Sequence, residues 1–409
     1  MTHIVQKQGA RPETPSAGAL GRPAGHCDWS AAITNFNGEE WVCETIASIK
    51  QLKPPPSEIL MVDDGSTDAG IERVRTEHPD VRIICLGRNT GVLNIVRNRA
   101  LHEARHRYVL ISDNDIAFAR DAVRQLMRAL QKHKDAAACT PLVLAADDRR
   151  TVLSQGHAMH FLGWATVARA TTVEGARELG EYKATGGGIQ LIDKVRAAPV
   201  GFFDEDLVLG WADDGEFHFR LQLAGLGCYT VPSAIVFHRR VRVQSRFYGQ
   251  LHNRWLLLLK HYQWRTLVLI APALLVYEFL LAGALLAMGV HRDYGRAIRD
   301  VVRDLPRVVR NRRHLRTLRQ LADRNVLSAE ALTGPRALLE RKIIRVGLNV
   351  LSSGFRLYWV LVYPLLGWPS ASTPGQPGSC EIPATDQAST GSSSPSAAAI
   401  DPNKTTPHA

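Results

Sequence analysis

The chain has 409 residues, enough for more than one domain, and 45% of them are hydrophobic, which is ordinary for a packed core and excludes a wholly disordered chain. Its formal net charge of +11 would suit nucleic-acid binding, but no recognition motif for nucleic acid accompanies the arginines. The six cysteines are scattered and include no Cys-x-x-Cys pattern, which argues against a zinc site and a disulfide framework and favours free thiols in a reducing cytosol.

Strand and helix patterns alternate through the N-terminal half, which is typical of β-α-β units on a largely parallel sheet. We predict strands at residues 29–36, 58–63, 81–86, 107–113 and 136–144. Helices are predicted at residues 39–52, 68–77, 91–105 and 119–133. No Gly-x-Gly-x-x-Gly follows the first strand and no Gly-x-x-x-x-Gly-Lys-Ser/Thr occurs anywhere, so a dinucleotide oxidoreductase and a Walker-type NTPase are disfavoured.

Two of the predicted strands end in pairs of acidic residues. Asp113 and Asp115, separated by one residue, follow one buried strand, and Asp63 and Asp64 follow another. The C-terminal edge of a parallel sheet is where open α/β folds bind ligands, and carboxylates there offer hard oxygen ligands to Mg²⁺ or Mn²⁺. A solvated turn or a helix N-cap is the alternative for the Asp113 and Asp115 pair.

Further motifs follow in a defined order. The ordered motifs are Thr34-Asn35, Asp63-Asp64-Gly65-Ser66-Thr67-Asp68, Asn89-Thr90-Gly91 with Arg97-Asn98, Asp113-Asn114-Asp115, Gly186-Gly187-Gly188, Gly201-Phe202-Phe203-Asp204-Glu205, Trp211-Ala212-Asp213-Asp214-Gly215-Glu216, Pro232 and His238. This order closely resembles the family 2 glycosyltransferases of the GT-A fold, and in particular their rhamnosyltransferase-like members. The resemblance covers residues 29–262 and implies an α/β nucleotide-diphospho-sugar transferase fold, with a mostly parallel central sheet flanked by helices.

The resemblance implies roles for several of these residues. The residues expected to bind the donor nucleotide are Thr34, Asn35, Asp63, Asp64, Asn89, Gly91, Arg97 and Asp113. Arg97 could meet the base or the diphosphate, and a solvated helix-face arginine is the alternative. Asp113 and Asp115 would hold Mg²⁺ or Mn²⁺, which neutralises the departing nucleoside diphosphate. His238 matches a third metal or phosphate contact of many GT-A enzymes, with a purely structural histidine as the alternative.

Inversion at the sugar needs a base that deprotonates the acceptor hydroxyl. Residues 213–216 read Asp-Asp-Gly-Glu where the family usually has Glu-Asp-x-Asp/Glu. Aligning Glu216 and Arg220 with the family's acid and arginine makes Asp214 the base, and Asp213 would help to hold its pKa and geometry. The departure from Glu to Asp leaves open which of the two is the base, and helix capping is the alternative for both. The resemblance also places three residues near the donor and acceptor sugars, namely Gly187, Gly188 and Trp211.

The C-terminal part is apolar and then basic. Residues 266–290 are long enough to span a bilayer, but they contain Pro272, Glu278 and Gly283. Residues 291–343 hold 14 Lys and Arg against 6 Asp and Glu, which is a net +8 of the chain's +11. With a cytosolic catalytic domain, a single span would carry this basic segment outside, against the positive-inside preference. We therefore expect the apolar segment to lie in the membrane plane or to re-enter.

Two more segments are predicted to be interfacial. Residues 346–368 are apolar, and the Arg-rich helix expected at 292–320 could lie on anionic lipid, with a solvated face packed on the catalytic domain as the alternative. The predicted parts of the chain are a disordered tail at 1–28, the GT-A catalytic domain at 29–262, a helical membrane-associated region at 263–369 and a disordered tail at 370–409.

The sequence thus predicts an inverting, metal-dependent glycosyltransferase on the cytosolic face of a bacterial membrane, acting in cell-envelope polysaccharide synthesis. It would move a sugar from a nucleoside-diphosphate sugar to a glycan or lipid-linked acceptor. A sugar-phosphate nucleotidyltransferase is the rival enzyme, but it would need a Gly-rich pyrophosphorylase signature near the N-terminus, which is absent. A basic membrane-bound scaffold without activity gives no reason for acids at successive strand ends.

Overall fold

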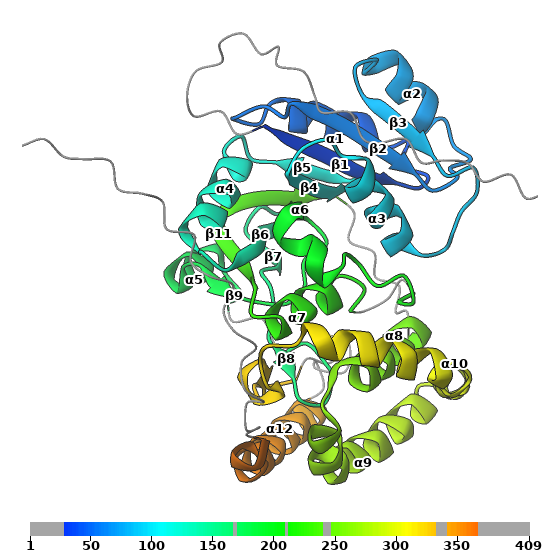
Figure 1. The fold of residues 1–409 in the computed structure, drawn as a ribbon, viewed down its shortest axis with the longest axis vertical. Coiled ribbons are helices and arrows are strands. Elements are labelled where there is room, and N and C mark those ends of the chain that lie inside the picture. The colour runs from blue at the N-terminus through cyan, green and yellow to red at the C-terminus, as the bar shows by residue number, and fades with distance from the viewer. Residues whose placement is uncertain (1–27, 167–169, 209–211, 240–246, 333–341, 367–409) are drawn as a thin grey trace, which may run out of the picture. The chain divides into compact units, whose positions relative to one another are not determined.

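The computed structural model describes residues 28–166, 170–208, 212–239, 247–332 and 342–366. Trp211 lies outside the described residues. So do the predicted tails at 1–28 and 370–409, with the exception of Asp28. The strands are β1 (Trp29–Asn35), β2 (Glu58–Asp63), β3 (Arg82–Cys85), β4 (Tyr108–Asp113), β5 (Ile116–Phe118), β6 (Ala136–Ala145), β7 (Val152–Ser154), β8 (Met159–His160), β9 (Tyr182–Lys183), β10 (Gln190–Asp193), β11 (Gly227–His238) and β12 (Leu327–Ser328). The α-helices are α1 (Val42–Lys50), α2 (Gly70–Glu77), α3 (Leu93–Glu103), α4 (Ala122–Lys132), α5 (Val173–Leu179), α6 (Lys194–Ala197), α7 (Gly215–Leu223), α8 (Phe247–His261), α9 (Trp264–Ala287), α10 (His291–Leu318) and α12 (Lys342–Val362), as Figure 1 shows.

The strands and helices predicted in the N-terminal half are confirmed, but each helix begins later than predicted. Polar turns occupy the residues between the predicted and the observed start of each helix. Before α1, Asn37 has a positive φ of 48°, and before α3, Gly91 has a φ of 70°. Before α2, the Asp68 carboxylate accepts the N–H of Gly70 at 3.1 Å.

The central sheet has ten strands, and its main path runs β3-β2-β1-β4-β10-β6-β11-β5. The first four are parallel neighbours, and β6 is parallel to β11. The short strand β10 runs antiparallel between β4 and β6, and β5 is antiparallel to β11. The sheet is therefore mixed but mostly parallel, and the carboxyl ends of β1, β2 and β4 share one edge.

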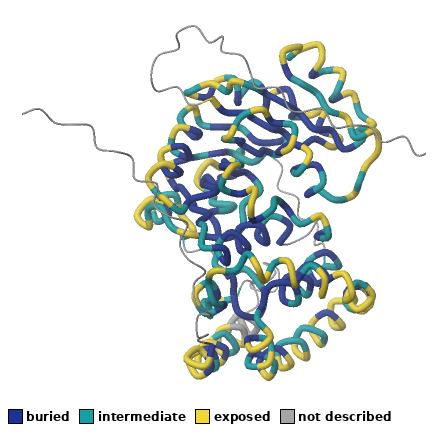
Figure 2. Tube along the Cα trace, in the orientation of Figure 1, coloured by how far each residue is buried: buried dark blue, intermediate teal, exposed yellow. Residues whose placement is uncertain are grey.

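Helices cover both faces of this sheet. Successive strand residues point to opposite faces, so Ile33 packs with α1, α2 and α4, whereas Ala32 packs with α3, α6 and α7. Figure 2 shows the strands buried between these helices. The arrangement is an α/β sandwich whose polar residues gather at the strand ends rather than inside it.

The remaining helices pack beside this sandwich. Helix α9 is the one helix of the described ranges that is long and apolar enough to cross a membrane, with a mean hydropathy of 2.2 and 11% of the tested window buried. The predicted Arg-rich helix is α10, whose Val301 and Val308 pack with Leu256 of α8. One face of α10 is therefore bound to its neighbours, as the alternative interpretation expected. The domain divisions at residues 28, 262 and 369 stay predictions.

Candidate active and metal site

The polar ends of β1, β2 and β4 meet at one edge of the sheet. Because these strands are parallel, Asn35 lies beside Asp63 and Thr34 lies beside Asp113. The Asn35 amide donates to Asp63 Oδ1 at 2.7 Å, and the Thr34 hydroxyl donates to Asp113 Oδ1 at 3.2 Å. These four predicted site residues thus form two hydrogen-bonded pairs on neighbouring strand ends.

Asp63 and Asp64 each stabilise a different loop. Asp63 accepts the N–H and the hydroxyl of Ser66 at 2.9 and 2.5 Å. Asp64 accepts the N–H and the hydroxyl of Thr90 at 3.0 and 3.1 Å. Donors from the chain itself therefore stabilise two adjacent carboxylates, which the sequence alone left to a ligand or a cation. The predicted contact of both acids with the donor nucleoside stays a prediction.

Asn89 and Gly91 lie in an exposed turn before α3. The side-chain oxygen Oδ1 of Asn89 accepts the N–H of Gly91 at 2.6 Å, and the positive φ of Gly91 favours glycine. The loop after β2 touches this turn, because a Cβ on Gly65 would lie 2.5 Å from the backbone nitrogen of Asn89. The two loops therefore support each other beside the strand ends.

Asp113, Asp115 and His238 converge on a candidate metal site. One potential ligand atom from each lies within 4.8 Å of the other two. Asp113 ends β4, Asp115 lies in the turn to β5, and β11 brings His238 beside Ile116. His238 Nε2 is 3.9 Å from Asp115 Oδ1, and its buried Nδ1 has no hydrogen-bond partner among the described residues. Two carboxylates and one imidazole suit Mn²⁺, and carboxylates also suit Mg²⁺, so the residues fit the predicted ion.

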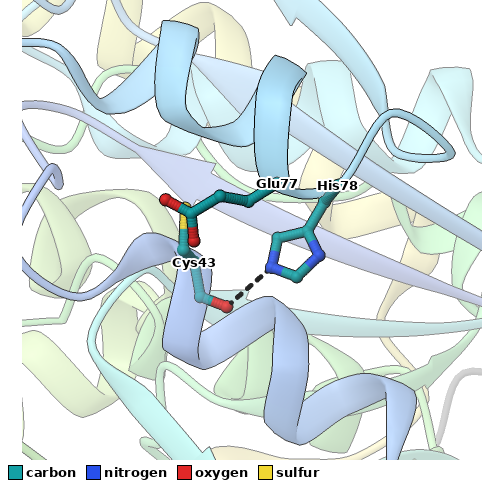
Figure 3. Close-up of side chains that lie close together, drawn as sticks. All are labelled: Cys43, Glu77 and His78. Atoms are coloured by element: carbon teal, nitrogen blue, oxygen red, sulfur yellow. Dashed lines mark hydrogen bonds between the residues drawn. The ribbon is translucent and has the colours of Figure 1, made fainter.

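A second cluster, Cys43, Glu77 and His78, also has the spacing of metal ligands, as Figure 3 shows. Its ligand atoms are already engaged. His78 Nε2 donates to the carbonyl of Cys43 at 3.0 Å, so its Nδ1 accepts from Lys50 Nζ at 3.2 Å. Burial and the Glu77 carboxylate raise the pKa of the Cys43 thiol, which disfavours the thiolate that binds metals. The cluster therefore links α1 to the end of α2 through a hydrogen bond.

Asp213 and Asp214 lie at the start of α7 and point to different partners. Asp213 Oδ2 is 3.2 Å from Nη1 of Arg97, and both side chains are buried. Asp214 Oδ2 accepts the N–H of Gly187 at 2.7 Å. Asp214 is the N-cap residue of α7, but its side chain makes no capping hydrogen bond to the helix. Capping alone therefore does not account for this pair.

The surroundings shift the pKa values of Asp213 and Asp214 in opposite directions. Burial and the neighbouring Asp214 charge raise the pKa of Asp213 to about 6. Burial also acts on Asp214, but the Arg97 guanidinium and the N–H of Gly187 outweigh it and lower the pKa of Asp214. Asp214 is therefore ionised at neutral pH, which is the state that a general base requires.

Arg97 and Gly188 join the metal site to this acid pair. Arg97 is 2% exposed, and its guanidinium lies 5.3 Å from the ring centre of Phe203. A Cβ on Gly188 would lie 3.1 Å from Arg97 Nη2 and 3.5 Å from Asp113 Oδ2. The absence of a side chain at this glycine thus leaves open the space between the two groups. The contact of Arg97 with Asp213 is observed, whereas its contact with the donor stays a prediction.

Two asparagines of α3 hold the acid pair in place, and the sequence interpretation assigned neither of them a role. Asn94 donates to the carbonyls of Asp204 and Asp213 at 2.9 and 2.7 Å. Asn98 donates to the carbonyl of Phe203 and accepts its N–H, both at 2.9 Å. Their partners lie more than a hundred positions away in sequence, so only the Asn98 motif gave a signal, through the resemblance.

The comparisons agree with the fold. Residues 30–180 match the sequence family described as Glycosyl transferase family 2. The N-acetylglucosaminyl-diphospho-decaprenol L-rhamnosyltransferase of Mycobacterium tuberculosis is 25% identical over 227 residues, covering 49% of this chain and 72% of that protein. The putative teichuronic acid biosynthesis glycosyltransferase of Bacillus subtilis is 25% identical over 122 residues, covering 29% of this chain and 48% of that protein.

Among solved structures, the crystal structure of GalNAc-T7 with UDP, GalNAc and Mn²⁺ has a TM-score of 0.50 and 14% identity, covering 69% of this chain and 58% of that one. This likeness concerns the fold alone. The chain spans about half the length of the B. subtilis protein, or 48%. With the ordered motifs and the sheet topology, these findings identify residues 30–180 as a glycosyl transferase family 2 segment of the chain.

Proposed function

We propose that the chain is an inverting, metal-dependent glycosyltransferase that moves a sugar from a nucleoside-diphosphate sugar to a glycan or lipid-linked acceptor. One observation carries this proposal: the Asp113 carboxylate and the Arg97–Asp213 pair approach each other at Gly188, with Asp214 beside Gly187. A cation site for a diphosphate and an ionised carboxylate are thereby placed on either side of Gly187 and Gly188. Inverting transfer needs both groups on opposite sides of the reacting carbon.

Separate residues would bind the metal ion and deprotonate the acceptor. Asp113, Asp115 and His238 would hold Mn²⁺ or Mg²⁺, and the ion would neutralise the charge of the departing diphosphate. Asp214 would take the proton of the acceptor hydroxyl, because it is the ionised member of the acid pair. The N–H of Gly187 donates to one of its oxygens and so fixes the orientation of the carboxylate.

One relative supports the proposed acceptor, and helix α9 supports the proposed location. The M. tuberculosis relative is named for a lipid-diphosphate acceptor, and it aligns over about half of this chain, 49%. Helix α9 has the apolar character of a membrane-associated segment. We therefore propose a lipid-linked or glycan acceptor at the cytosolic face of a bacterial membrane, in the synthesis of a cell-envelope polysaccharide.

The first test is metal-dependent binding of the product. The purified chain is screened for thermal stabilisation by UDP, GDP and dTDP, with and without Mn²⁺. Asp113→Asn and Asp115→Asn should lose the Mn²⁺-dependent stabilisation, whereas Asp147→Asn, a control at an exposed acid, should retain it. Equal stabilisation of all three variants would remove the metal site from the proposal.

The second test separates the proposed reaction from its rivals. The nucleotide sugar of the selected nucleotide is incubated with the chain and Mn²⁺, and nucleoside diphosphate release is measured. A transferase releases the diphosphate, whereas a nucleotidyltransferase would form nucleoside triphosphate from nucleotide sugar and pyrophosphate. A scaffold without activity would show neither product.

A further inference from the structure

Most exposed large apolar residues of the C-terminal helices lie on α9 and α12, and α10 adds Val302, Leu305 and Val309. On α9 they include Val268, Leu275, Val276, Phe279, Leu280 and Leu286, and on α12 they are Val350, Leu357, Val360 and Leu361. Phe279 is 80% exposed and Leu275 is 71% exposed, values that a folded protein in water rarely gives to large side chains in such number. We call the ten residues named on α9 and α12 the apolar surface. Figure 2 shows the exposed residues along both helices.

The two helices that carry the apolar surface lie side by side. Ile270 and Leu274 of α9 pack in one cluster with Phe355 and Trp359 of α12. The hydroxyl of Tyr358 also donates to the carbonyl of Leu269 at 2.6 Å. The inner faces are therefore bound to each other and to the core, and the outer faces remain without partners among the described residues.

Apolar clusters connect α9 to α8. Ile270 of α9 belongs to one cluster with Leu257 and Leu258 of α8, and Leu285 of α9 belongs to another with Leu251 of α8. Helix α8 is itself fixed to the catalytic part, because Lys260 donates to Asp204 and Asp206, each at 2.6 Å.

A buried ion pair holds the middle of α9 in this position. Glu278, the one charged residue between positions 266 and 290, pairs with Arg254 of α8, whose side chain is 0% exposed. Tyr294 of α10 donates to the other Glu278 oxygen at 2.6 Å. If α9 left α8 to cross a bilayer alone, Glu278 would enter the hydrocarbon and Arg254 would lose its partner, and both changes are costly.

From this geometry we propose that the apolar surface lies against a lipid bilayer, with α9 in the plane of the membrane and both of its ends on the same side. The inference rests on the membrane location proposed above. Trp264 and Tyr363, both exposed, lie near the ends of the two helices, where aromatic side chains suit the membrane interface. The net +8 of residues 291–343 would draw this part of the chain toward anionic lipid. A lipid occupant explains both the apolar and the basic character, which a second copy of a basic chain does not.

The first experiment tests the surface by flotation of the full chain with vesicles of phosphatidylglycerol and phosphatidylethanolamine. The double variant Leu275→Ser, Phe279→Ser should reduce the vesicle-bound fraction about ten-fold or more, because two large apolar side chains no longer enter lipid. The control variant Leu179→Ser, Val195→Ser changes two exposed apolar residues outside the surface and should bind like the wild type. Equal flotation of both double variants would overturn the proposed surface.

The second experiment tests the orientation of α9 by cysteine labelling. Arg265→Cys and Met288→Cys place one thiol near each end of α9, in a background in which Cys27, Cys85 and Cys380 are serine and only the buried Cys43, Cys139 and Cys228 remain. An impermeant maleimide should label both positions in inside-out membrane vesicles and neither in right-side-out vesicles. Labelling of the two positions from opposite sides would show that α9 spans the membrane.

Two further readouts distinguish a failure of the surface from a failure of the proposed function, and a lipid bilayer from a second copy of the chain. Metal-dependent nucleoside diphosphate binding should be the same in the Leu275→Ser, Phe279→Ser variant as in the wild type, so a failure of the surface does not imply a failure of the proposed function. The wild type is also compared with this variant by sedimentation in detergent without lipid. A dimer that the variant abolishes would assign the surface to a second copy and overturn the lipid proposal.

Discussion

Protonation of Asp213 should control the turnover of the proposed transferase. Asp213 shares Arg97 with Asp214, and its pKa of about 6 lies well above the ordinary value of 3.8 because it is buried beside Asp214. When Asp213 is ionised, it takes up part of the Arg97 charge and keeps Asp214 a stronger base. When Asp213 is protonated, Arg97 acts on Asp214 alone and weakens it as a base.

The size of this effect follows from the pKa of Asp213. Because the pKa of Asp213 is raised to about 6, Asp213 loses its charge as the pH falls from 7 to 5. The wild-type kcat should therefore fall by up to about ten-fold between pH 7 and pH 5. Asp213→Asn cannot ionise, so its kcat should be low at pH 7 and nearly constant over this range. Asp214→Asn removes the base and should lower kcat by about 10²-fold or more at every pH.

The assay is nucleoside diphosphate release at saturating nucleotide sugar and saturating Mn²⁺, so that kcat reports the bound state. Saturating metal also ensures that metal binding does not limit the rate at any pH of the profile. Asp147→Asn serves as the control and should keep the wild-type profile. A 10²-fold loss in Asp213→Asn with an active Asp214→Asn would reverse the assignment, and an unchanged profile in Asp213→Asn would refute the coupling through Arg97.

Three more outcomes are expected. His238→Ala should raise the Mn²⁺ concentration needed for half-maximal nucleotide stabilisation by about ten-fold or more, and an unchanged titration would exclude His238 as a ligand. Gly188→Ala puts a methyl group 3.1 Å from Arg97 Nη2, so kcat should fall about ten-fold with little change in melting temperature; a wild-type kcat would show that this space is not used. Glu278→Ala leaves the buried Arg254 without its partner and should lower the free energy of unfolding by about 3–5 kcal/mol in a urea titration, whereas a loss below about 1 kcal/mol would indicate that the pair is open in solution.

The fold of the N-terminal half could be predicted because its signals are local. Apolar runs such as Ile59 to Val62 give a strand, and polar turns bound each helix. Strand β10 escaped prediction because Gln190–Asp193 is only four residues long and follows a run of glycines. Its antiparallel position between β4 and β6 depends on pairing with strands that are distant in sequence. Periodicity describes what an element is, but not which neighbour it pairs with.

The site divides in the same way. The Thr34–Asp113 and Asn35–Asp63 pairs follow from the rule that parallel strands end at one edge, so the sequence could bring these residues together. The Arg97–Asp213 pair joins residues 116 positions apart, and nothing local in either segment signals it. The alternative of a solvated helix-face arginine does not describe Arg97, because α3 turns this residue inward.

Helix α9 shows how one buried charge decides what hydropathy leaves open. Its length and composition are compatible with a span and with an in-plane helix. Glu278 separates the two, because its partner Arg254 belongs to a helix that is fixed to the catalytic part through Lys260. The Glu278–Arg254 pair holds the middle of α9 against α8. The charge argument from the sequence and this contact from the structure therefore both support the proposed in-plane orientation.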